Sequence, residues 1–143
     1  MNLIRFAKNL IIAGLLVSAG ISDLKSRRIS LYPMLFAGAA LVLCAVLERD
    51  RAFADILGGM AVGGVLYLAS RVTKGKIGEG DACIIGVIGI GSGLLCNLQI
   101  LCTGLVFAAI LSGILLITGT GDRDTRLPFV PFLFAGYLIA APV

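Results

Sequence analysis

Apolar runs long enough to cross the hydrocarbon core of a membrane recur along almost the whole of this 143-residue sequence. That core is about 30 Å thick and a helix rises about 1.5 Å per residue, so about 20 apolar residues are enough to cross it. Because 59% of the residues are hydrophobic and only 14% are charged, the chain has too few polar side chains to cover a soluble domain. The sequence therefore predicts an integral membrane protein.

Six spans can be drawn, at residues 3–21, 29–47, 53–70, 82–95, 100–118 and from about 127 onward. The polar residues between 96 and 99 are expected to form a tight turn between the fourth and fifth spans. The prediction is an all-α, polytopic bundle of about six transmembrane helices, which forms a single domain over residues 1–143.

The positive charge of the chain points to lipid. The net charge is +4, but the basic residues lie in short clusters beside the apolar spans, so a bilayer rather than a nucleic acid is the expected partner. The loops after the first, third and fifth spans hold eight Lys and Arg residues, and the opposite side holds four. Cytoplasmic loops carry the excess of cations, so these three loops are predicted to face the cytoplasm from a multi-pass cell membrane protein.

Glycine spacing predicts close helix packing in two of the spans. Gly59 with Gly63, and Gly89 with Gly93, are small-xxx-small pairs, which let helix backbones approach each other in lipid. Packing alone accounts for these glycines, and they carry no chemistry.

The acid–base candidates are few, because the chain has no histidine. Its four cysteines form no CxxC pair, so a metal site is not expected, nor is a cofactor: Cys44, Cys83, Cys96 and Cys102. Six of the eight acids alternate with cations, face them or lie at the end of a span. The remaining two, Asp23 and Asp81, each lie where a span meets a predicted cytoplasmic loop, and acids at such boundaries are functional candidates.

Each aspartate also has a structural interpretation. Asp23 is four residues before Arg27 and can pair with it along a helix. Asp81 precedes an apolar span and can serve as its N-cap. A cap alone, however, does not need the two glycines that precede it in Gly78-Glu79-Gly80-Asp81. Gly78 and Gly80 permit unusual backbone angles and the close approach of a peptide backbone to the carboxylate.

Three motifs together resemble the type IV prepilin peptidases, which are GxGD-type membrane aspartyl proteases. The segment 23–30, DLKSRRIS, is similar to their first aspartate motif, and residues 76–81, KIGEGD, to their GxGD motif. Residues 127–132, LPFVPF, are similar to the proline–phenylalanine signature that opens their last span. The three motifs occur in the family's order and cover nearly the whole chain. The chain has no large loop with paired CxxC motifs, so it resembles the short forms without methyltransferase activity.

The resemblance implies an aspartic-type endopeptidase with Asp23 and Asp81 as the catalytic pair. The implied substrate is a type IV prepilin or pseudopilin precursor, whose short basic leader is cut at the cytoplasmic membrane face, in pilus assembly or protein secretion. Leu31 and Cys83 depart from the family pattern, which has Asn and Lys at the matching places. Two alternatives therefore stay open: a non-catalytic membrane subunit of a pilus or secretion assembly, and a small ion-coupled transporter.

Overall fold

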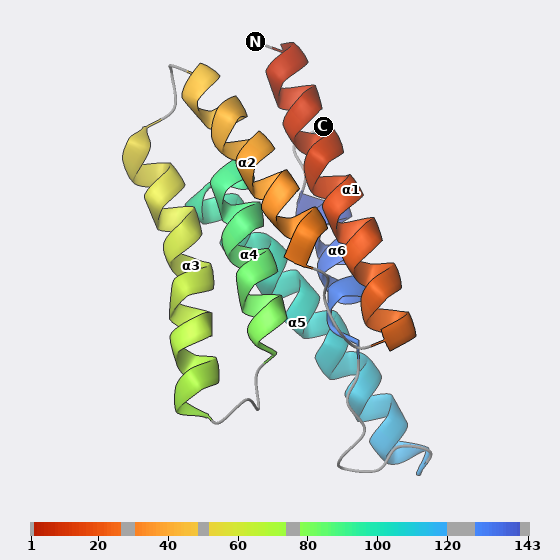
Figure 1. Ribbon diagram of the computed structural model, residues 1–143. Helices are drawn as coiled ribbons and strands as arrows, with labels where there is room; N and C mark the ends of the chain where they lie inside the picture. Colours follow the sequence, from red (N-terminus) through yellow and green to blue (C-terminus); the bar gives the residue numbers. More distant parts are fainter. Residues whose placement is uncertain (1, 27–30, 49–51, 74–77, 120–127, 141–143) are drawn as a thin grey trace.

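The computed structural model describes residues 2–26, 31–48, 52–73, 78–119 and 128–140. In this part of the chain it contains six helices and no strand, so the all-α prediction is confirmed (Figure 1). The helices are α1 (Asn2–Ser26), α2 (Leu31–Leu47), α3 (Phe53–Val72), α4 (Glu79–Ser92), α5 (Leu94–Ile117) and α6 (Val130–Ala140).

Three helices are long and apolar enough to cross a membrane: α1 over Leu3–Lys25, α3 over Phe53–Val72 and α5 over Leu94–Ile117. The helices α2 and α6 are apolar but shorter. Successive helices run in opposite directions, which brings the end of α1 and the beginnings of α4 and α6 into the lower half of Figure 1.

The boundary between the fourth and fifth helices differs from the prediction. The break lies at Gly93, whose φ of 84° ends α4, and α5 begins at the next residue. Asn97, expected in a turn, lies inside α5 and is buried. Its amide group donates hydrogen bonds to the carbonyl oxygens of Gly59, at 2.9 Å, and Ile85, at 3.1 Å. The prediction was wrong because a polar residue that joins three helices looks, in sequence, like a turn residue.

The glycines of α3 lie against the glycines of α4, as their spacing predicts. A β-carbon at Gly59 would overlap the backbone of Gly89, and one at Gly63 would overlap that of Gly86. The small-xxx-small prediction is thus confirmed at three of its four positions, since Gly93 serves as the helix break instead.

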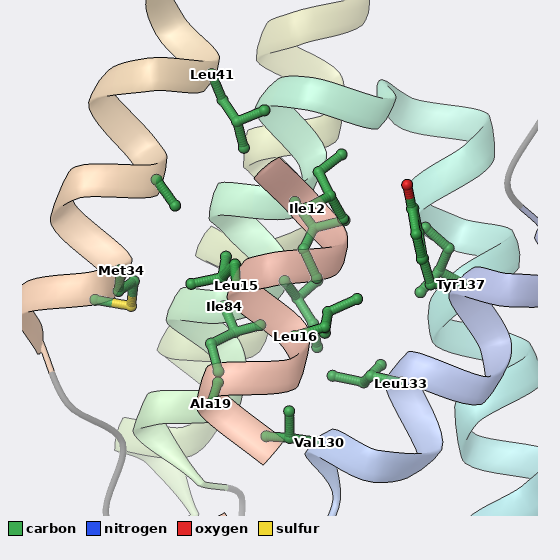
Figure 2. Close-up of a cluster of buried hydrophobic side chains, with 14 residues drawn as sticks. Ile12, Leu15, Leu16, Ala19, Met34, Leu41, Ile84, Val130, Leu133 and Tyr137 are labelled. Carbon is green, nitrogen blue, oxygen red and sulfur yellow. The ribbon is translucent and has the colours of Figure 1, made fainter. Parts of the chain in front are cut away.

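The core lies between α1, α2, α4 and α6, and Ile100 of α5 also belongs to it (Figure 2). Leu16, Ile84 and Leu133 come from three different helices and have no exposed surface. Val130, the first residue of α6, is equally buried, and its side chain lies at the lower end of the cluster in Figure 2. This packing determines where α6 begins relative to the end of α1.

Candidate functional site

Asp23 lies in the last turns of α1. The sequence places the end of the first span at about residue 21, but α1 continues to Ser26 and Asp23 is helical. Its side chain is half-buried. One carboxylate oxygen, Oδ2, accepts a hydrogen bond from the backbone N–H of Val130, with an N···O distance of 3.4 Å. Arg27, the proposed helical partner of Asp23, lies outside the described residues.

Asp81 lies in the first turn of α4 and is also half-buried. The N-cap of this helix is Gly78, so the interpretation of Asp81 as the N-cap is wrong. Asp81 is the third residue of the helix, because α4 begins three residues earlier than the apolar run. The carboxylate is therefore held on a helix and not in the loop before it.

The two aspartates interact electrostatically. Asp81 precedes the apolar stretch of α4 and lies outside the three helices long enough to span a membrane. Burial, and after it the negative charge of Asp23, raise the pKa of the Asp81 carboxyl to about 6. Both effects disfavour a second negative charge at this end of the bundle. The structure thus brings together the two carboxylates that the sequence singled out, although 58 residues separate them in the chain.

Gly78 lies directly against the Asp81 carboxylate. A β-carbon at position 78 would lie 2.6 Å from Oδ2 of Asp81 and 3.2 Å from its Cγ. Gly78 has φ −62° and ψ 119°, angles that other residues also adopt, so close approach explains this glycine better than conformational freedom. Gly80 lies between Glu79 and Asp81 in the first turn of α4.

The other residues near this end have separable roles. Glu79 lies 3.9 Å from Nε of Arg71, and both side chains are more than half exposed, so this is a surface ion pair between α4 and α3. Cys83 packs against the core, and Leu31 is exposed at the start of α2.

An open apolar groove of about 370 Å³ lies between the second half of α5 and the start of α6. Its lining residues are small or apolar: Leu105, Ala108, Ala109, Ser112, Phe129 and Phe132. Phe129 directly precedes Val130, whose N–H reaches Asp23. The groove and the aspartate therefore share the beginning of α6.

Two further acids form polar contacts that join one helix to another. Glu48 forms an ion pair with Lys8, which joins the end of α2 to α1 where both side chains are almost buried. Asp55 accepts a hydrogen bond from the backbone N–H of Leu94 at 3.0 Å, and so caps α5 from α3. Both acids are expected from the sequence to be structural, but neither partner is evident there.

The N–H of Val130 is the contact to the site that the sequence analysis missed. A signal of this contact was present in the sequence. Pro128 and Pro131 lie on either side of Val130 and both lack an N–H, so Val130 is one of the few backbone donors at this point of the chain. In the described part of the chain, no group of three or more His, Cys, Asp or Glu residues is placed to hold a metal ion.

Comparison of the chain with protein-family models, curated proteins and solved structures finds no match.

Proposed function

We propose that this chain is a membrane aspartyl endopeptidase that cleaves the leader of type IV prepilin or pseudopilin precursors. The observation that carries the proposal is that Asp23 and Asp81, from two helices, lie at the same end of the bundle, where burial and the charge of Asp23 raise the pKa of Asp81. Two of the three motifs that resemble the prepilin peptidases contain these residues, one aspartate in each. Acids at the end of a membrane bundle are costly, which favours a functional reason for keeping two of them together.

Two carboxylates that share one proton suffice for peptide hydrolysis. The ionised carboxylate takes a proton from water as the water oxygen bonds to the scissile carbonyl carbon. The carbonyl oxygen takes the proton of the other carboxyl, which gives a gem-diol. When the C–N bond breaks, the first carboxyl protonates the leaving nitrogen and a hydroxyl of the diol returns its proton to the second. The pair ends with one proton, as it began.

The substrate class follows from the resemblance and is compatible with the surroundings of the pair. The loops at this end carry the larger share of Lys and Arg, which favours a cytoplasmic orientation. A leader peptide followed by an apolar helix would present its cleavage site at the same depth. The open groove lined by Phe129 offers an apolar surface beside the start of α6, whose first residue donates a hydrogen bond to Asp23.

The test is co-expression of the protein with a type IV prepilin and measurement of the mature product by gel shift. Wild type is expected to cleave, and Asp23→Asn and Asp81→Asn are each expected to abolish cleavage without loss of the protein from the membrane. Asp55→Asn is the matched control, because asparagine retains an oxygen that can accept the N–H of Leu94. Full cleavage by either of the first two variants would exclude the aspartate pair. A wild-type protein that binds the precursor without cutting it would favour the non-catalytic subunit.

A further inference from the structure

The beginning of α6 offers Asp23 a hydrogen-bond donor that has no use within the helix. The first N–H groups of any helix have no acceptor one turn earlier. Pro128, before α6, and Pro131, within it, carry no N–H, and the N–H groups of Phe132 and Leu133 are bonded to the carbonyl oxygen of Phe129. The N–H of Val130 is left free and points to Oδ2 of Asp23, at 3.4 Å.

The position of this donor is determined by the core. The side chain of Val130 has no exposed surface and lies beside Gly20 of α1, where a β-carbon would be 3.9 Å from its Cγ1. Gly20 is three residues before Asp23 and therefore on the same face of α1. The same contact that packs α6 against α1 thus directs the N–H of Val130 to the carboxylate.

Hydrogen bonding at a helix N-terminus favours the ionised form of a carboxylate, because the N–H donates and the helix dipole is positive there. The charged or titratable groups on the elements around Asp23 are few in the described part of the chain. Near Asp23, helix α1 itself has Lys25, and α4 has Glu79, Asp81 and Cys83. Helices α2 and α6 have only tyrosine and cysteine side chains. Of these, Asp81 is the group that interacts with Asp23.

Asp81 is in a different environment. It lies in the first turn of α4, where the helix dipole also favours a negative charge. Burial outweighs that effect, since the pKa of Asp81 is raised to about 6. Within the described residues no hydrogen-bond donor to the Asp81 carboxylate is found, and Oδ2 lies against Gly78, which has no side chain.

We propose that Asp23 is the carboxylate that takes the proton from water, that the Val130 N–H positions its Oδ2 for this role, and that Asp81 is the protonated partner. This assignment rests on the proposed protease function. Asp81 then protonates the carbonyl oxygen while water bonds to the carbonyl carbon, and Asp23 later delivers its proton to the leaving nitrogen. Val130 is a positioning residue and takes no part in bond making.

The test is the pH dependence of kcat/KM for prepilin cleavage by Val130→Pro, which removes the N–H, and Val130→Ala, which keeps it. Proline is tolerated at the first position of a helix. Loss of the N–H makes the first ionisation of the pair harder, so the acidic limb of the profile is expected to move up by about half to one pH unit. Val130→Ala keeps the N–H but trims the side chain that directs it, so the acidic limb is expected to move less than in Val130→Pro.

If Val130→Pro does not fold, 2-hydroxy-3-methylbutanoic acid at position 130 replaces the amide by an ester and keeps the valine side chain. The ester is expected to shift the acidic limb in the same way. A shift of the alkaline limb with an unmoved acidic limb would make Asp81 the base, and an unchanged profile would remove the role of Val130. Either result leaves cleavage by wild type intact, whereas failure of the proposed function would appear as no cleavage by wild type at any pH.

Discussion

Gly59 of α3 and Gly89 of α4 lie so close together that a β-carbon on either residue would overlap the carbonyl oxygen of the other. Helices that approach in this way gain dispersion contacts along their backbones, which is a main source of stability between helices in lipid. Asn97 of α5 strengthens the same junction, since its amide group donates to the Gly59 carbonyl.

Gly59→Ala is expected to lower the stability of the protein, because the added methyl group forces α3 and α4 apart. Overpacking of this kind typically costs about 1–3 kcal/mol. Gly64→Ala is the matched control on the same helix, since nothing lies within 4 Å of a β-carbon there. The measurement is the thermal unfolding midpoint in detergent. Equal midpoints for the two variants would contradict the close approach of α3 and α4.

Gly78→Ala is expected to reduce the cleavage rate at least about tenfold, which corresponds to roughly 1.4 kcal/mol of transition-state stabilisation. The reason is that the new methyl group would displace the Asp81 carboxylate, whose Oδ2 would lie only 2.6 Å away. Glu79→Ala, in the same turn but half exposed, should have a smaller effect. The measurement is the initial rate of prepilin cleavage at matched enzyme concentration, and a Gly78→Ala rate equal to that of wild type would refute the positioning role.

The stability of the protein is expected to fall as the pH rises from about 4 to 6. Asp81 has a pKa of about 6 in the folded protein, against about 3.9 for an ordinary aspartate, so the folded state binds this proton more tightly. The stabilisation is fully present below pH 4 and is lost as the pH passes through 6, with a slope of up to about 1.4 kcal/mol per pH unit.

Asp81→Asn should flatten this dependence, because asparagine does not titrate. The measurement is the unfolding midpoint in detergent at pH 4, 5, 6 and 7. Glu79→Gln serves as a control for loss of a neighbouring, more exposed carboxylate. A wild-type midpoint that rises steadily over this range, by the same amount in Asp81→Asn, would count against a raised pKa at Asp81.

The orientation in the membrane is testable at the two ends of α3, which is long enough to cross a bilayer. Because the loop after α3 is predicted to be cytoplasmic, Thr73→Cys should be protected from an impermeant thiol reagent in intact cells. Ala52→Cys, before the same helix, should react. The background protein has its four native cysteines replaced. The reverse labelling pattern would place the aspartates outside and exclude cleavage of a cytoplasmic leader.

The sequence alone predicts the all-α class and most of the helix positions. It also singles out the two aspartates as acids at the ends of apolar runs. The apolar runs of this chain predict helices. In a membrane the backbone N–H and C=O groups find no water, so they must form hydrogen bonds with each other. An isolated acid at the end of such a run is visible in sequence for the same energetic reason. The small-xxx-small spacing similarly predicts the close contact of α3 with α4.

Only the tertiary structure decided which groups surround those aspartates. The partner of Asp23 is a backbone N–H 107 residues away, and one of the two partners of Asn97 is a carbonyl oxygen 38 residues away. Every residue but proline has these backbone groups, so sequence patterns do not distinguish the one that is used. What distinguishes it is the packing of Val130 and Gly59, which places one free N–H and one carbonyl oxygen within reach of a side chain from another helix.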